Sequence, residues 1–227
     1  MSRVAALRNV SLFSNLSDQE LEVLAEHLRK RTFARGMIIF HKDSPGRSLY
    51  IIESGKVRIF ILSESGQEIS VRIYGCGEVF GELSMLNGLP RSAGAIAMEQ
   101  TQVLTLHRDD FLSLLERYPQ MAPGIIATLS GRVRYTTEYA ESLAFLDVYG
   151  RVAKRLLQLA DGYGVEKEQG VEIELRLTQS DLASLVGATR ESVNKVVGTF
   201  RDQGLIEVEG QRITILDRRG LKRRISY

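Results

Sequence analysis

Four residue types that can hold a phosphorylated sugar fall within one short segment, residues 80–93. Gly81 lets the backbone come close to a ligand, and the amides from Glu82 onward are expected to open a helical turn whose N-terminus attracts anions. Arg91 can donate two parallel hydrogen bonds to one phosphate. Ser92 adds a hydroxyl, and Glu82 offers an acceptor for a ribose hydroxyl. The spacing therefore predicts an anion-binding loop that also contacts a sugar.

Two other interpretations of this segment are open. Glu82 and Arg91 could form an ion pair that closes a loop between two strands. A nucleotide-processing enzyme would need a general base with a metal ion or a nucleophile nearby, and no paired carboxylates or His/Asp cluster accompany the segment. A Walker-type phosphate loop is excluded, because no Gly-Lys-Ser/Thr follows the glycines. We therefore predict no catalytic residues and no enzyme activity.

The chain has few residues that could bind a metal ion or form a disulfide. Cys76 is the single cysteine, which excludes an intramolecular disulfide and an all-cysteine iron–sulfur cluster within one chain. The three histidines, His27, His41 and His107, show no ligand spacing. Cys76 lies between two glycines, and we expect a buried packing residue there rather than a haem ligand. No metal site is predicted.

The bulk composition favours two modest domains within 227 residues. An apolar fraction of 44% and a charged fraction of 26% are ordinary for a globular protein, and no run of about 18 apolar residues could span a bilayer. Residues 1–9 lack the apolar core of a signal peptide, so we expect a cytoplasmic protein without a membrane partner. Residues 151–227 contain 14 Lys/Arg against 11 Asp/Glu, an excess that a nucleic-acid partner would require.

We call the anion-binding segment, residues 80–93, the phosphate-type loop. The elements that must position it are short strands. Apolar runs separated by glycines recur about every 8 to 12 residues between residues 35 and 107, which is typical of a sandwich or jelly roll. The runs are residues 37–40, 49–52, 57–61, 69–73 and 103–106. The loop lies inside this predicted roll, before its last strand. A capping box at residues 17–20 predicts a short amphipathic helix ahead of the roll.

A long helix is predicted after the roll, with Pro119 and Pro123 in first turns or a break. Its seam residues follow steps of four and three, as in a coiled coil. They are Ala122, Ile126, Leu129, Val133, Thr136, Ala140 and Leu143. This stripe predicts pairing with a second copy, and the alternative is packing back onto the roll.

Thr136 places a hydroxyl group in this seam, and Thr137 is its neighbour. We expect Thr136 and Thr137 to close a pocket from the helix side by bonding the base of a nucleotide held by Arg91. The alternative is that each hydroxyl bonds back to its own helix.

Residues 144–147 are predicted to form a hinge after the long helix, because Asp147 can cap the next helix. Residues 172–177 alternate in polarity and predict one half-buried strand.

The C-terminal part of the chain has the spacing of a helix-turn-helix. Thr178-Gln179 begins one helix, Gly187 ends it, and Thr189 caps a second. Residues 205–208 and 212–215 predict a hairpin that completes a winged helix. The second helix presents side chains of types that read bases in the major groove. They are Arg190, Glu191, Asn194 and Lys195. The alternative is an ordinary pair of helices joined by a glycine turn.

Taken together, these motifs resemble the Crp-Fnr family of bacterial regulators over nearly the whole chain. The matching segments are FGELSML and PRSA of the phosphate-type loop, SLAFLDVYGRVAKRLLQLA at residues 142–160, and LTQSDLASLVGATRESVNKVV at residues 177–197. The resemblance implies an α+β protein. Its parts are an N-terminal β jelly-roll cyclic-nucleotide-binding domain (1–118), a long dimerisation helix and hinge (119–146), and a C-terminal winged helix-turn-helix (147–227).

The resemblance also implies roles for individual residues. The effector would be cyclic AMP, held by Gly81, Glu82, Leu83, Ser84, Arg91, Ser92, Thr136 and Thr137. The DNA-binding set would be Thr178, Gln179, Arg190, Glu191, Ser192, Asn194 and Lys195. Lys195 stands where the family type has arginine, so the base it reads is open. The linker before Arg91 is one residue shorter than in the family type.

The predicted function is a cyclic-nucleotide-responsive regulator. A homodimer would bind double-stranded DNA at a palindrome with TGTGA-like half-sites, and RNA polymerase is an expected partner. Cyclic AMP would act as an allosteric effector and not as a catalytic cofactor. The alternative is a Crp-Fnr regulator that needs no effector or senses a different small molecule.

Overall fold

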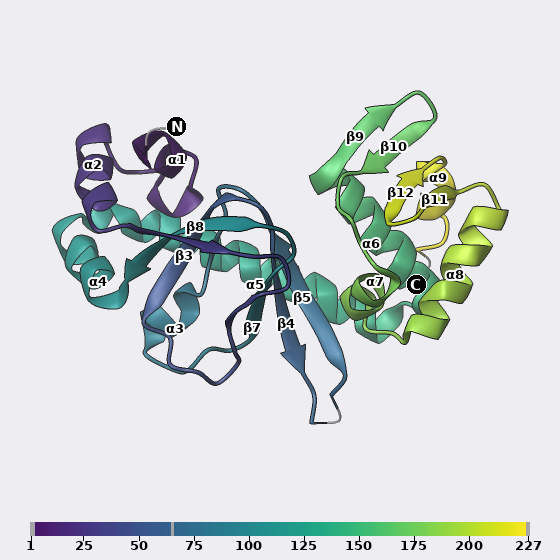
Figure 1. The fold of residues 1–227 in the computed structure, drawn as a ribbon, viewed down its shortest axis with the longest axis horizontal. Helices are drawn as coiled ribbons and strands as arrows, with labels where there is room; N and C mark the ends of the chain where they lie inside the picture. Colours follow the sequence, from purple (N-terminus) through teal and green to yellow (C-terminus); the bar gives the residue numbers. More distant parts are fainter. Residues whose placement is uncertain (1–2, 65, 226–227) are drawn as a thin grey trace. The chain divides into compact units, whose positions relative to one another are not determined.

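Two four-stranded sheets form the N-terminal part of the protein (Figure 1). Their strand orders are β1-β8-β3-β6 and β2-β7-β4-β5. The strands are β1 Arg29–Phe33, β2 Ile38–Phe40, β3 Ser48–Ser54, β4 Val57–Leu62, β5 Glu68–Tyr74, β6 Val79–Phe80, β7 Gly94–Ala97 and β8 Thr101–His107. The five predicted apolar runs each fall on a strand. Strands β1, β6 and β7 were not predicted, because β1 is mostly exposed and charged and the other two are very short.

The structure is a computed structural model that describes residues 3–64 and 66–225. The chain divides into two compact units. The first contains Met1–Gly66 and Val71–Tyr135, and the second contains Gln67–Ser70 and Thr136–Tyr227. In the described part of the chain, no helix is long and apolar enough to cross a membrane.

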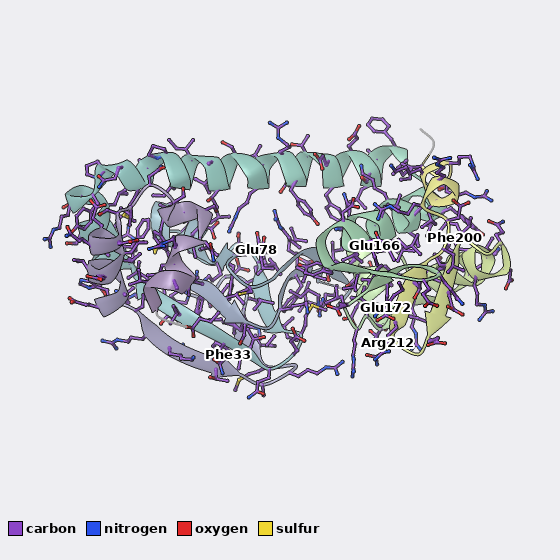
Figure 2. All side chains as sticks on the ribbon, turned by 90° about the horizontal axis from the view of Figure 1, so that it is seen from above. Phe33, Glu78, Glu166, Glu172, Phe200 and Arg212 are labelled. Atoms are coloured by element: carbon purple, nitrogen blue, oxygen red, sulfur yellow. The ribbon has the colours of Figure 1, made fainter. Side chains whose placement is uncertain are left out.

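The first unit has two apolar clusters, one on each face of the sheet that contains β3. Tyr50 and Ile52 belong to a cluster shared by both sheets, whereas Leu49 and Ile51 belong to a cluster shared with the surrounding helices. Both faces of β3 are therefore buried, which explains its continuous apolar sequence. The aromatic ring of Phe33, labelled in Figure 2, joins the cluster between the sheets.

Short helices cover the outer face of that sheet and lie together in Figure 1. They are α1 Arg3–Arg8, η1 Ser11–Phe13, α2 Asp18–Glu26, α4 Arg108–Arg117 and η2 Pro119–Met121, and α3 Glu82–Asn87 lies within the phosphate-type loop. The predicted capping box is confirmed at α2, where Ser17 and Glu20 bond each other's backbone amides.

The prediction that Cys76 is buried is wrong. Cys76 is exposed, and its thiol donates to the carbonyl of Glu53 at 3.1 Å.

The long helix α5 spans Ala122–Phe145. Pro119 begins η2 and Pro123 lies in the first turn of α5, as predicted. The predicted seam divides between two environments. Leu129 packs against the helix-covered cluster of the first unit. The side chains of Ile126 and Val133 are exposed, at 62% and 68% of their surface.

The second unit contains a helical core and a small sheet of order β11-β12-β10-β9. Its elements are α6 Val148–Tyr163, β9 Gly164–Lys167, β10 Gly170–Ile173, α7 Gln179–Val186, α8 Arg190–Asp202, β11 Ile206–Glu209, β12 Arg212–Ile215 and α9 Arg218–Lys222. The strand predicted at residues 172–177 is wrong in extent. Residues 170–173 pair in a hairpin with β9, while Leu175 and Leu177 are buried without extending β10. The predicted wing is confirmed as the β11–β12 hairpin.

Candidate functional site

The guanidinium of Arg91 lies inside the phosphate-type loop, with only 3% of the residue exposed. Its two terminal nitrogens donate to backbone carbonyls, Nη1 to Gly81 at 2.5 Å and Nη2 to Ser48 at 2.7 Å. The remaining nitrogen, Nε, is buried and has no hydrogen-bond partner in the described part of the chain. Of the three guanidinium nitrogens of Arg91, only Nε thus makes no hydrogen bond to the described residues.

Aromatic rings hold this guanidinium in place. Its central carbon lies 4.3 Å from the ring centroid of Phe40 and 5.6 Å from that of Tyr50, distances at which a ring face attracts a cation. Tyr50 in turn stacks on Phe80 at 4.9 Å. Burial lowers the pKa of Arg91 from its usual value, while Tyr50 and Glu82 oppose the change. An arginine side chain is not deprotonated in proteins, so Arg91 remains a cation.

The loop between β2 and β3 lies against the same arginine. The amide of Arg91 donates to the carbonyl of Ser44 at 2.9 Å, and the amide of Asp43 donates to the carbonyl of Arg91 at 2.8 Å. Gly46 follows, and a Cβ atom added there would lie 2.2 Å from the Cβ of Ser84 and 3.0 Å from Nε of Arg91. No side chain fits at Gly46, so the loop closes tightly over the buried hydroxyl of Ser84.

Glu82 is the buried acid of this loop, with 1% of the residue exposed. One carboxylate oxygen, Oε1, accepts from Nη1 of Arg132 on α5. Arg132 also donates through Nη2 to the carbonyl of Val79. The other oxygen, Oε2, is buried and has no hydrogen-bond partner among the residues that the structure describes. The alternative prediction of an ion pair between Glu82 and Arg91 is wrong, because Glu82 forms its ion pair with Arg132 of α5.

The other residues predicted to bind an effector lie nearer the surface. Leu83 and Ser92 are exposed, in contrast to the buried Glu82, Ser84 and Arg91. Thr136 and Thr137 belong to the second unit and are also exposed. Their contact with a nucleotide base stays a prediction.

Sequence reasoning missed three parts of this site. Arg132 had a usable signal, because it lies four residues before Thr136 and thus on the same face of α5. Gly46 follows Pro45, and such a pair marks a turn but does not reveal what the turn touches. The aromatic support of Phe40, Tyr50 and Phe80 had no distinct signal, since each residue reads as ordinary strand core.

The second candidate site is the helix-turn-helix formed by α7 and α8. Gly187 ends α7 in a left-handed conformation, with φ 61°, and Thr189 caps α8 by accepting from the amide of Ser192. Three of the predicted base-reading side chains are exposed in the first turns of α8. They are Arg190, Glu191 and Lys195. These local signals were enough to predict both helices.

Of the other predicted DNA-binding residues, Thr178 and Ser192 make hydrogen bonds within the protein. The Thr178 hydroxyl donates to the Asp181 carboxylate at 2.6 Å and caps α7, while Gln179 is exposed. Ser192 accepts from the hydroxyl of Thr189 at 3.0 Å. Asn194 is half-buried, and its Oδ1 is buried with no hydrogen-bond partner within the described residues. Because Oδ1 is buried, only the NH2 group of the Asn194 side chain could reach a partner such as DNA.

Two arginines of α6 hold the turn of the helix-turn-helix. Arg151 donates through Nε to the carbonyl of Val186 and through Nη1 to the carbonyl of Leu146, both at 2.8 Å. Arg155 is buried and donates through Nη2 to the carbonyl of Leu185 at 3.0 Å. Carbonyls at a helix end have no partner within the helix. Arg151 thus joins the end of α7 to Leu146, in the short connection between α5 and α6.

Replacing Arg151 with methionine is expected to destabilise the second unit. Two half-buried carbonyls would lose charged donors, each worth about 1.5 to 3 kcal/mol. We expect faster hydrogen exchange at the amides of α7 and α8 in the full-length protein, with little change in the amides of β3 and β8. An Arg176→Met protein, altered at an exposed arginine of the same unit, is the matched control. Equal exchange in both variants would contradict the assigned role.

Comparisons with known proteins agree with these two sites. The family model for the cyclic nucleotide-binding domain matches residues 30–118, and the model for the Crp-like helix-turn-helix domain matches residues 150–224. A CRP-like cAMP-activated global transcriptional regulator of Mycobacterium tuberculosis is 35% identical over 218 residues, which cover 96% of this chain and 97% of the relative. The cyclic AMP receptor protein of Thermus thermophilus is 33% identical over 202 residues, which cover 89% and 90%.

Solved structures share the fold. The structure of a c-di-GMP responsive global regulator of Xanthomonas campestris has a TM-score of 0.80 at 25% identity, and the match covers 88% of this chain and 100% of that chain. The catabolite activator protein of Thermus thermophilus is 31% identical over 95% of this chain and 98% of its own, with a TM-score of 0.55.

A cyclic nucleotide-binding domain followed by a helix-turn-helix defines a DNA-binding transcription regulator. The chain belongs to the Crp-Fnr family of these regulators. The predicted fold class is thereby confirmed. The enzyme alternative is wrong, because the relatives are transcription regulators.

Proposed function

We propose that this protein is a dimeric transcription regulator whose affinity for DNA is controlled by a cyclic nucleotide, with cyclic AMP as the effector. Arg91 would bind the cyclic phosphate, and Glu82 the ribose. Thr136 and Thr137 would bond the base. The relatives from Mycobacterium tuberculosis and Thermus thermophilus are named for cyclic AMP, which supports this choice.

One observation carries the proposal. The phosphate-type loop contains a buried donor without a partner, Nε of Arg91, and a buried acceptor without a partner, Oε2 of Glu82. Buried polar atoms left unpaired in this way cost about 1 to 3 kcal/mol each, and a ligand that binds in the loop would explain why two of them lie there. A cyclic nucleotide offers the complementary pair, a phosphate oxygen that accepts and a ribose hydroxyl that donates.

The exposed apolar residues of α5 support association with a second copy. Ile126 and Val133 lie seven residues apart on the predicted seam, and more than half of each side chain is exposed. A repeat of seven residues places both on one helix face. Two copies of this helix would bury that face against each other, and the twofold axis would suit a palindromic DNA site.

Replacing Val133 with glutamate is expected to abolish the dimer. A charge would be buried at the centre of an apolar seam without a partner, which proteins strongly disfavour. We expect a monomer in analytical ultracentrifugation at micromolar concentration, where the wild type should be a dimer if the proposal is right. An Arg134→Glu protein, with the same new charge at an exposed position off the seam, should remain dimeric. A dimeric Val133→Glu protein would overturn this assignment of the interface.

The DNA target follows from the exposed residues of α8. Arg190 can pair bidentately with guanine, and Glu191 can accept from cytosine. We propose a palindrome with TGTGA-like half-sites about one helical turn apart. Lys195 would contact a further base or a phosphate, and RNA polymerase would be a later partner at the promoter. Such a target lies in the bacterial cytoplasm, in agreement with the location expected from the sequence.

The deciding experiment measures DNA binding with and without nucleotide. Fluorescence anisotropy with a labelled TGTGA palindrome should show tighter binding in cyclic AMP, by about 5- to 150-fold if the coupling has the usual size. Calorimetric titration with cyclic AMP, cyclic GMP and c-di-GMP identifies the effector. The regulator from Xanthomonas campestris is described as c-di-GMP responsive, so that ligand is the specific alternative. DNA binding that no nucleotide changes would instead favour an effector-independent regulator.

A further inference from the structure

The positive charge of the C-terminal part of the chain is concentrated around its last helix, α9. Residues 217–224, which we call the basic segment, contain five Lys/Arg and one Asp. The remainder of this part, residues 151–216 and 225–227, contains nine Lys/Arg against ten Asp/Glu. Lys and Arg that neutralise phosphates supply much of the affinity of a protein for DNA. The excess charge that such binding requires therefore lies in these eight residues.

The basic segment is anchored along α6 and is not a loose tail. At one end, Arg218 forms an ion pair with Asp161 in the last turn of α6. At the other end, the carbonyl of Arg224 lies beside Gly150 in the first turn of α6, where an added Cβ atom would be 3.2 Å from the carbonyl oxygen. Between these ends, the side chain of Leu221 is fully buried. The segment thus runs antiparallel to α6, which fixes where its cations lie.

The same end of α6 supports the helix-turn-helix. Arg151 in its first turn bonds the end of α7. Tyr149 packs edge-on against Phe200 of α8, which is labelled in Figure 2, with 6.0 Å between the ring centroids. The side chain of Arg224 donates to Gln203, the residue that follows α8, at 2.7 Å. The basic segment is therefore attached to the C-terminal end of α8, whose N-terminal turn contains the proposed base-reading residues.

Four cations of the basic segment are exposed, namely Arg219, Lys222, Arg223 and Arg224. Arg223 forms an ion pair with Asp217 at 3.7 Å. Among the residues that the structure describes, the side chains of Arg219 and Lys222 have neither an ion pair nor a hydrogen bond. They lie three positions apart in α9 and thus on one face of the helix. These two cations are available to an anionic partner.

We propose that the basic segment is a second DNA-binding surface, which contacts phosphates of the duplex that flanks each half-site. This inference rests on the proposed function above. Helix α8 has 13 residues and is therefore about 20 Å long, which corresponds to about six base pairs of B-DNA. If α8 lies along the major groove, the basic segment at its far end falls outside the bases read by Arg190. Contacts to phosphates carry no sequence information, so any flanking sequence would serve.

The test measures DNA binding by the full-length protein in cyclic AMP, using fluorescence anisotropy with two labelled duplexes. Both contain the same TGTGA palindrome, and one is extended on each side by about 10 base pairs, one helical turn. The wild type should bind the longer duplex more tightly. An Arg219→Gln/Lys222→Gln protein should lose this advantage. Two contacts vanish in each protomer of a dimer, so on the longer duplex the slope of log affinity against log salt should become shallower by about 3 to 4.

The control variants keep or remove charge elsewhere. Lys167 on β9 is an exposed cation of the same unit, and Lys167→Gln should leave the salt slope unchanged, whereas Lys222→Gln should reduce it. Arg219→Lys/Lys222→Arg retains both charges and should bind the longer duplex as the wild type does. A damaged fold would weaken binding to both duplexes equally, which separates a structural effect from a lost contact with flanking DNA.

Two results would overturn the proposal. In one, the wild type and the Arg219→Gln/Lys222→Gln protein have the same affinity and salt slope on the longer duplex. In the other, the double variant loses equal affinity for both duplexes. If the wild type binds the palindrome at neither length, the proposed target or effector is wrong. A duplex of arbitrary sequence at low salt then tests the basic segment alone, because the double variant should still show the shallower slope.

Discussion

Replacing Arg91 with glutamine is expected to weaken the proposed binding of cyclic AMP by about 30- to 5000-fold. This range corresponds to about 2 to 5 kcal/mol, the usual cost of truncating one member of a buried, hydrogen-bonded charge pair. The phosphate would then enter a buried site that lacks the Arg91 cation and still contains the acidic side chain of Glu82. Isothermal titration calorimetry with cyclic AMP measures the loss directly.

The control for this prediction removes a charge from the neighbouring loop. Arg47 is exposed, and Arg47→Gln should bind cyclic AMP as the wild type does. Because Arg91 also bonds the carbonyls of Gly81 and Ser48, thermal unfolding of each variant is recorded without ligand. Arg91→Lys retains the charge but not the planar fork, so its affinity should be intermediate. A folded Arg91→Gln protein with undiminished affinity would refute the assignment of the phosphate site.

Replacing Arg190 with alanine is the second change with a large expected effect. A bidentate contact between arginine and guanine is worth about 1 to 3 kcal/mol, and a dimer loses it in both half-sites. We therefore expect DNA affinity to fall by about 30-fold or more in the presence of cyclic AMP. Discrimination at one base pair of each half-site should also relax. Fluorescence anisotropy with a TGTGA palindrome and single-base variants tests both effects.

A matched control lies on the same helix. Arg201 is exposed in the last turn of α8, where it pairs with Asp202 at 3.6 Å. Arg201→Ala removes an equal charge from the end of α8 farther from the proposed groove contact, so its effect should be small and independent of sequence. If Arg190→Ala and Arg201→Ala weaken binding equally on all sequences, α8 does not read bases through Arg190.

The helix-turn-helix was predictable because its signals are local. Thr178, Gly187 and Thr189 each act on the backbone within three or four residues, so a single sequence contains the information. The same holds for the capping box at Ser17. Strand β1 was missed because four of its five residues are exposed, and its pairing with β8 joins residues 68 to 76 positions apart.

The effector site was predictable in its residue types but not in its connections. Gly81, Glu82 and Arg91 are close in sequence, which made the phosphate-type loop visible. The partner of Glu82 is 50 residues away on α5, and only the fold brings Arg132 to it. The exposed thiol of Cys76 was mispredicted for a related reason, because flanking glycines indicate a turn but not which way its side chain faces.

The contacts of Arg91 lower the entropic cost of binding a ligand at this site. A long, flexible side chain normally loses rotational freedom when it captures an anion, and that entropy opposes association. Here two carbonyls and two ring faces immobilise the guanidinium during folding. The entropic cost is therefore incurred before any ligand arrives. A small, rigid ligand such as a cyclic nucleotide gains most from this arrangement, because neither partner has to become ordered on contact.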